Sequence, residues 1–160
     1  MHQVGLLIRS IESFLDDEHG DWVAGLSCGH GQHMRHKPPL VTRPWVLIAE
    51  GRAARIGESI ECVLCDRFEL PAGFESYCKT DELDEVTLPA GLRRDHTTRP
   101  GVWAIIHVTA GQLRYIVEPP LASERVLDPE HPGIVVPEVR HRVEPIGPMR
   151  CHVEFFRRPG

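Results

Sequence analysis

The sequence lacks the features that mark three large classes of protein. Its longest apolar runs, such as residues 45–49, are far shorter than the ~20 residues that span a bilayer. It contains no block of basic residues and its net charge is −5, which argues against a nucleic-acid partner. The N-terminal stretch MHQVGLLIRS reaches Arg9 after a short apolar run and offers no small-residue cleavage site, which argues against a secretory signal. We therefore expect a soluble, cytoplasmic protein that contacts neither nucleic acid nor membrane.

The chain is also too short for a large α/β enzyme. Its 160 residues suffice for one ordinary domain or two small ones, since domains cluster around ~100–150 residues. What it does contain is 14 glycines and 14 prolines, a share above the roughly 12% that is usual. Hydrophobic residues make up 41% of the chain and charged residues 26%. This composition predicts a folded, turn-rich protein that is mainly β.

The net charge is concentrated in one short segment. Residues 1–68 carry 7 basic and 9 acidic residues, residues 69–86 carry 1 and 6, and residues 87–160 carry 10 and 8. The middle segment also has a Pro-Ala-Gly break and few aliphatic residues, so we interpret it as an acidic linker between two small domains. The alternative is a solvated loop or short helix within one domain. Phe74 and Tyr77 favour partial docking of this segment.

Apolar and turn-forming residues alternate in a way that predicts short strands. Residues 11–15 and 22–26 flank the polar run DDEHGD, which predicts a β-hairpin. Residues 43–57 combine strand-favouring and helix-favouring residues, so either structure is open there. Several short strands with turns every ~8–12 residues are typical of a sandwich or barrel. In the C-terminal part we expect such strands, separated by glycine or proline, over residues 101–109, 113–117, 126–127, 134–136, 141–143 and 151–156.

Cysteines and histidines form two short motifs in the first 68 residues. One is the run CGHGQHMRHKPP, which begins at Cys28, and the other is the run CVLC, which holds Cys62 and Cys65. A C-x-x-C turn points two thiolates at one metal, and zinc takes four nitrogen or sulfur ligands at tetrahedral corners. The three cysteines and one histidine would complete a closed, structural zinc site. The candidates for the fourth ligand are, in order of preference, His30, His33 and His36.

Zinc would have a physical role in so small a domain, because its binding, worth ~10–16 kcal/mol in zinc-finger peptides, becomes folding free energy. The alternative is a set of ordinary buried cysteines beside exposed histidines. A redox role for the C-x-x-C pair is weaker, since no βαβ pattern surrounds it. The chain has five cysteines, an odd number that cannot all pair, which favours a reducing compartment. We expect Cys78 to be an exposed thiol and Cys151 a buried strand residue.

The N-terminal part resembles a known family. The run DWVAGLSCGHGQHMRHKPP, followed by RPWV, a GR pair and CVLC, is similar to a small bacterial domain of unknown function. That domain is defined by a CGH-x-QH-x-RH-x-PP motif and a closing C-x-x-C, and the resemblance covers roughly residues 2–68. It implies a zinc-binding ligand pattern and no particular reaction.

The C-terminal part contains four short motifs, at residues 88–92 (LPAGL), 101–103 (GVW), 111–113 (GQL) and 141–145 (HRVEP). Through these motifs it resembles the cupin-like domain of the tellurite-resistance type, which occurs alone or ahead of a TehB methyltransferase. The two halves together lead us to expect a mainly β fold. A small zinc-ribbon-like domain would precede a cupin-like double-stranded β-helix, or jelly-roll, barrel. Methyl transfer is not implied, because no Gly-rich strand-to-helix turn for S-adenosylmethionine is present.

Two histidines match the pattern of the second family, His96 and His141, and they could face each other across a pocket. Glu154 is a possible third partner if it points inward. Such a pocket could hold a small ligand, a second metal or an oxyanion. The H-x-H pair that active metal cupins use is absent at His107. Four arginines near the expected barrel mouth could attract the oxyanion: Arg93, Arg94, Arg140 and Arg142. The alternative is that they are solvated surface charges.

These observations support three hypotheses on function. The first is a non-enzymatic binding protein in which a zinc-stabilised module accompanies a ligand-binding barrel, in stress or tellurite resistance. The second is a small metal-dependent cupin enzyme, an isomerase or oxygenase, with His96 and His141 as ligands; two histidines alone hold iron or manganese poorly. The third is an interaction module that recruits a partner through its N-terminal domain. A homodimer through the barrel would be compatible with each of them.

Overall fold

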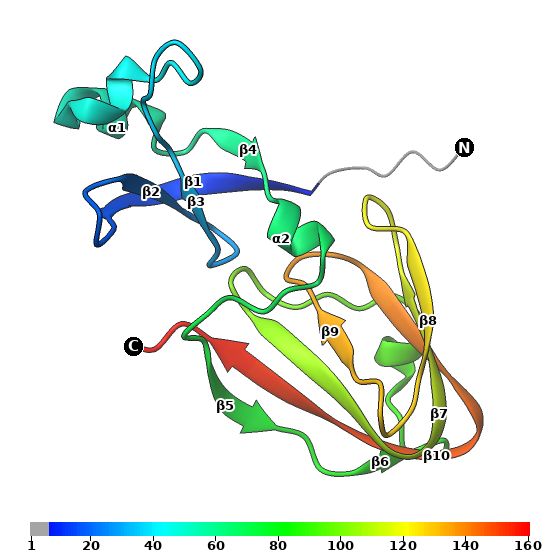
Figure 1. Cartoon of the computed structure of the whole chain (residues 1–160). Coiled ribbons are helices and arrows are strands. Elements are labelled where there is room, and N and C mark those ends of the chain that lie inside the picture. The colour runs from blue at the N-terminus through cyan, green and yellow to red at the C-terminus, as the bar shows by residue number, and fades with distance from the viewer. Residues whose placement is uncertain (1–6) are drawn as a thin grey trace.

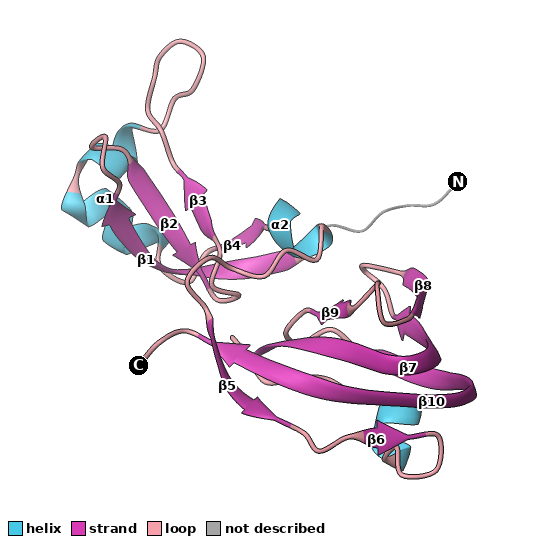
Figure 2. Ribbon diagram, turned by 60° about the horizontal axis from the view of Figure 1, so that its bottom comes forward, coloured by secondary structure: helices cyan, strands magenta, loops and turns pink. Residues whose placement is uncertain are grey.

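The computed structural model describes residues 7–160, and its strands form two antiparallel sheets, which lie one above the other in Figure 1 (Figures 1 and 2). The first sheet has the order β3-β2-β1-β4 and contains β1 (Ile8–Asp16), β2 (Trp22–Leu26), β3 (Gly31–His33) and β4 (Ser59–Glu61). The predicted hairpin is confirmed, because β1 and β2 pair with Phe14 opposite Ala24. Alternate residues of these strands are buried, as the side-chain period of a strand requires.

The stretch that the sequence left open is helical. Between β3 and β4 the chain forms a 3-10 turn, η1 (Pro44–Leu47), and a short helix, α1 (Ala49–Arg55). Pro44 stands at the start of η1, where its missing N–H costs no hydrogen bond. The guanidinium of Arg52 lies 3.6 Å from the ring centre of Trp22, so the helix covers the hairpin by a cation–π contact. A second short helix, α2 (Val63–Asp66), follows β4.

The second sheet has the order β5-β10-β7-β8, with β6 on β10 and β9 on β7. Its strands are β5 (Glu75–Lys79), β6 (Leu83–Asp84), β7 (Trp103–Val117), β8 (Ser123–Leu127), β9 (Gly133–Val135) and β10 (His141–Arg157). The sheet curls around β7 and β10 and closes about half of a barrel (Figure 1), with the 3-10 turn η2 (Ala90–Arg93) beside it. The expectation of a mainly β protein is confirmed. None of the helices in the described range is long and apolar enough to cross a membrane.

The sequence predicted a turn between the strands expected at 101–109 and 113–117, and another between those expected at 141–143 and 151–156. Both predictions are wrong, because β7 and β10 continue through these positions. Residues 110–112 lie inside β7, and the two strands expected at residues 141–143 and 151–156 are the ends of β10. Gly111 has φ +74°, and a Cβ there would collide with the carbonyl of Pro148 on β10. The glycine therefore permits a bend and a close strand crossing within the sheet, where the pairing register shifts.

The acidic segment 69–86 carries two strands rather than a free connection. β5 pairs with β10 with Cys78 opposite Phe155, and β6 pairs with β10 with Leu83 opposite Cys151. Cys78 is exposed and Cys151 is buried, as expected. Acidic residues at the edge of a sheet discourage pairing with other chains, which is consistent with their concentration here.

Candidate metal centre and ligand cavity

The first two candidate ligands come from the turn between β2 and β3. Cys28 lies in this turn and His30 directly before β3. The N–H of Leu26 donates to the carbonyl of His30 at 2.9 Å, and the N–H of Gly29 donates to the carbonyl of Leu26 at 2.9 Å. Gly29 has φ +100°, in the left-handed region that favours glycine, and the ring of Phe74 packs where its Cβ would stand. The Cys-Gly-His sequence therefore brings a thiol and an imidazole to the same side of one tight turn.

The other two candidates come from the start of α2. Cys62 precedes the helix and Cys65 lies within it, so the C-x-x-C pair presents both sulfurs from one helical turn. The N–H of Cys62 donates to the carbonyl of Leu7 at 2.8 Å, and the N–H of Leu7 donates to Oδ1 of Asp66 at 2.9 Å. These bonds hold α2 against the start of β1.

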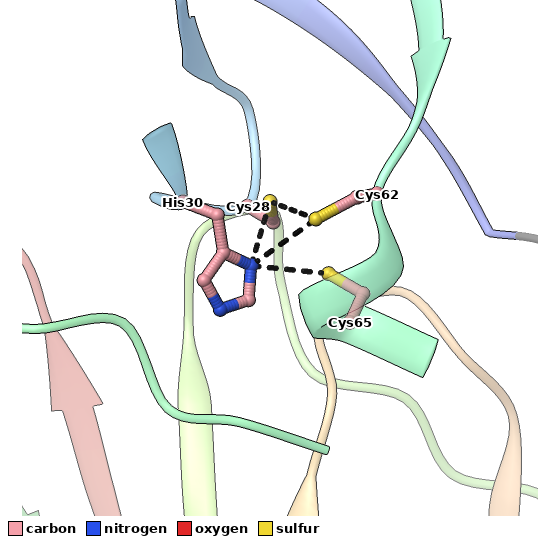
Figure 3. Close-up of side chains that lie close together, drawn as sticks. All are labelled: Cys28, His30, Cys62 and Cys65. Carbon is pink, nitrogen blue, oxygen red and sulfur yellow. Dashed lines mark hydrogen bonds between the residues drawn. The ribbon is translucent and has the colours of Figure 1, made fainter. Parts of the chain in front are cut away.

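The four side chains converge on one buried point (Figure 3). Cys28 and Cys65 are fully buried, and Cys62 and His30 are 3% and 4% exposed. Nδ1 of His30 lies 3.3 Å from Sγ of Cys28, 3.3 Å from that of Cys62 and 3.5 Å from that of Cys65. The sulfurs of Cys28 and Cys62 are 3.7 Å apart. Zn–S bonds of ~2.3 Å and a Zn–N bond of ~2.0–2.1 Å at tetrahedral angles imply ligand separations of about 3.8 Å and 3.5 Å. The cluster therefore has the dimensions of a tetrahedral zinc site.

The surroundings of the cluster prepare its atoms for metal binding. Nε2–H of His30 donates to the carbonyl of Glu69 at 2.6 Å, which leaves the lone pair of Nδ1 directed at the three sulfurs. Hydrogen bonds with Cys28 and Cys65 lower the pKa of the Cys62 thiol, so the cluster stabilises a thiolate, the form that binds metal. Burial alone would lower the pKa of His30, but its hydrogen bonds to Cys28 and Cys62 raise it to about 10, so metal binding at Nδ1 would displace a proton.

The cluster also joins the two sheets. Nε1–H of Trp103, at the start of β7, donates to the carbonyl of Cys28 at 2.7 Å, and its ring meets the ring of His30 edge to face at 5.2 Å. Arg9 on β1 is buried and its Nη2 donates to the carbonyl of Pro137 at 2.7 Å. No pattern in the sequence places Trp103 or Arg9 at this junction.

The remaining histidines of the motif lie elsewhere. The side chain of His33 is half exposed and its Nδ1 is 3.4 Å from a carboxylate oxygen of Asp17. Nδ1 of His36 accepts a hydrogen bond from the N–H of Arg43 at 2.8 Å. Of the three histidines considered, the structure brings His30 to the cysteines.

His96 and His141 meet on the second sheet. Each donates its backbone N–H to the carbonyl of the other at 2.9 Å, which puts both imidazoles on one side. Nδ1 of His96 lies 3.3 Å from Nε2 of His141, and both rings line a cavity of about 280 Å³ on the concave face of the sheet. Burial lowers the pKa of His96 and lowers that of His141 to about 4, so both imidazoles are uncharged at neutral pH.

Glu154 does not join this pair, so the interpretation of it as an inward partner is wrong. Cys151, Val153 and Phe155 line the cavity, and Glu154 alternates to the opposite face of β10. There its carboxylate lies 3.0 Å from Nε2 of His107 and 3.6 Å from Nζ of Lys79. The alternation of apolar and polar residues along 150–155 was the signal that could have settled this orientation.

The four arginines considered for an oxyanion do not line the cavity. Arg93 donates to the carbonyl of Glu85, Arg140 lies 3.4 Å from Asp95, and Arg142 lies 2.9 Å from Glu118. The sequence did not single out Thr80 and Thr98, which line the cavity together with Cys151 and apolar side chains of β7, β9 and β10.

Fold and site together define a mainly β protein with a buried Cys-Cys-Cys-His cluster beside a curled half-barrel. The comparisons divide at the same place. Residues 13–69 match the model of a family described as "Protein of unknown function (DUF3565)", and residues 79–153 match that of a "TehB-like domain". Both resemblances seen in the sequence are thereby confirmed.

Two solved structures share part of this fold. TehB from Haemophilus influenzae is 24% identical with a TM-score of 0.50, over 54% of this chain and 32% of that chain. A protein from E. coli strain K12 is 22% identical with a TM-score of 0.52, over 57% of this chain and 98% of that one. The chain thus spans about a third of the length of TehB. No curated protein matches the chain.

Proposed function

We propose that this chain is a non-enzymatic, zinc-stabilised binding protein, with a metal centre in residues 1–68 and a small-ligand cavity in a cupin-like domain over residues 87–160. The observation that carries the proposal is the convergence of four buried donor atoms within 4.8 Å of one another. Zinc binds readily to three sulfurs and one imidazole, whereas harder cations bind oxygen ligands.

A structural role for the metal follows from the filled coordination. Four protein ligands leave no open position for water or substrate, and each ligand is at most 4% exposed. The first sheet is small, and two of the donors come from a turn that contains a left-handed glycine. Metal binding would therefore supply folding free energy to a unit with little core of its own.

The cavity supports binding rather than metal chemistry. Its two histidines are hydrogen-bonded to each other, and Glu154 faces away, so the described residues offer no facial triad there. We place the protein in the cytoplasm, where its five unpaired cysteines would stay reduced. The TehB-like match supports a role in tellurite resistance or a related stress.

The test is elemental analysis of the purified protein and two cysteine variants. We expect about one zinc per chain in the wild type, loss of zinc and a lowered melting temperature in Cys62→Ser, and no change in Cys78→Ser. Cys78 is the matched control because it is an exposed cysteine outside the cluster. A third variant, His141→Ala, should keep its zinc. A chain that folds without metal while all five cysteines are intact would overturn the proposal.

A further inference from the structure

The cavity of the second sheet has almost no polar lining. Apolar side chains from three strands and the η2 region form its walls, among them Leu92, Ile106, Val143 and Phe155. Among residues 7–160, no Asp, Glu, Lys or Arg side chain lines it. A charged ligand would lose its hydration there without gaining a partner of opposite charge, which disfavours its binding.

Two threonines of the cavity make hydrogen bonds within the protein. The hydroxyl of Thr98 donates to the carbonyl of Val102 at 2.7 Å, and the hydroxyl oxygen of Thr80 accepts from the N–H of Val153 at 3.0 Å. The histidine pair supplies the ring nitrogens of the lining, and its proton positions decide whether these nitrogens accept a hydrogen bond from a ligand or donate one.

The proton positions of the pair follow from one carbonyl. Nδ1 of His141 lies 3.2 Å from the carbonyl of Val139, which can only accept, so this nitrogen carries the proton. His141 is 5% exposed and its uncharged ring then has a lone pair on Nε2. That lone pair accepts from Nδ1–H of His96, which leaves Nε2 of His96 as an unprotonated nitrogen. Among the ring nitrogens of the pair, Nε2 of His96 is therefore left as an acceptor, and no N–H is left as a donor.

We propose that the cavity binds a small, uncharged, mostly apolar molecule that carries one hydroxyl or N–H group, and that this group donates to Nε2 of His96. The inference rests on the proposed binding function and narrows its ligand class. A cavity of about 280 Å³ exceeds the ~150 Å³ in which an engineered apolar cavity holds benzene, so a fused bicyclic ring fits. Tellurite and other oxyanions do not suit this site, because its histidines are uncharged and its walls are apolar.

Two bicyclic probes of similar shape test the proposal on the zinc-loaded full-length protein. Indole has an N–H donor, and the slightly larger benzothiophene has none. We expect both to shift the amide resonances of Ile106 and Val143 in NMR titrations, and indole to bind about fivefold more tightly, the value of one net hydrogen bond. Benzoate and tellurite should leave these resonances unchanged.

The variant His96→Phe removes the acceptor and keeps an aromatic ring. We expect it to abolish the preference for indole and to retain benzothiophene binding. His131→Phe is the control, since His131 is 71% exposed and lies outside the cavity. It should keep the wild-type preference.

Three results would overturn the inference: equal affinity for the two probes, a preference for indole that survives in His96→Phe, or no binding of indole. Binding of benzoate or tellurite in the cavity would overturn the ligand class while leaving a small-molecule function intact.

Discussion

Trp103 connects the metal centre to the second sheet, and replacing it by phenylalanine measures that connection. The indole is fully buried and its N–H is the donor to the carbonyl of Cys28 in the described structure. Trp103→Phe leaves this buried carbonyl unsatisfied, which costs about 1–3 kcal/mol. The smaller ring also leaves a void beside His30, which adds about 1 kcal/mol.

We therefore expect Trp103→Phe to lose about 2–4 kcal/mol of unfolding free energy in urea titrations with zinc in excess. For a chain of this size, that corresponds to a melting temperature lower by roughly 4–16 °C. Zinc should also transfer faster to a chelator, because the turn that holds Cys28 loses its support. Both quantities are measured on the same protein preparation.

Trp22→Phe is the matched control. Trp22 is partly exposed, contacts Arg52 through its ring face and is not one of the four residues of the metal cluster. It should cost under about 1 kcal/mol, as cation–π contacts at exposed sites do, and leave zinc transfer unchanged. A loss below about 0.5 kcal/mol in Trp103→Phe, or equal losses in the two variants, would refute the reasoning.

Two further predictions concern the turn and the cavity. Gly29→Ala should destabilise the protein by about 1–3 kcal/mol, and by more than Gly20→Ala. Both glycines have positive φ, but only at Gly29 does a ring, that of Phe74, occupy the position of the added Cβ. Urea titrations of the two variants measure the difference, and equal losses would contradict it. Burial lowers the pKa of His141 from an ordinary 6.5 to about 4. Between pH 6.5 and 4 the unfolded chain therefore binds a proton at His141 that the folded chain does not bind. The free energy of unfolding then falls on acidification, by up to about 3 kcal/mol. His141→Phe should lose this share of the pH dependence between pH 6.5 and 4, and an unchanged profile would show that the imidazole is not held neutral.

The metal ligands could be predicted because their geometry is local. Cys62 and Cys65 are one helical turn apart, and Cys28 and His30 share one tight turn, so spacing alone pairs them. The choice among three histidines depended on more than spacing. His33 lies on the strand after the turn, where alternation turns its ring toward Asp17 and away from the sulfurs.

The cavity was only partly predictable because its residues meet across the sheet. His96 and His141 are 45 positions apart and form an isolated bridge, so only the family resemblance singled them out. Gly111 indicated a turn between two strands but lies inside β7, because glycine is used both for a bend within a long strand and for a chain reversal. The acidic charge of residues 69–86 led to their interpretation as a linker, but charge does not reveal that β5, within this segment, pairs with β10 as an edge strand.

X-ray absorption at the zinc edge of the purified protein tests the central claim most directly. The account predicts about one zinc per chain with three sulfur ligands at ~2.3 Å and one imidazole nitrogen at ~2.0–2.1 Å. The His30→Ala variant should lose the imidazole signal, whereas His33→Ala should retain it. A spectrum dominated by oxygen ligands, or an imidazole signal that disappears with His33 and not with His30, would contradict it.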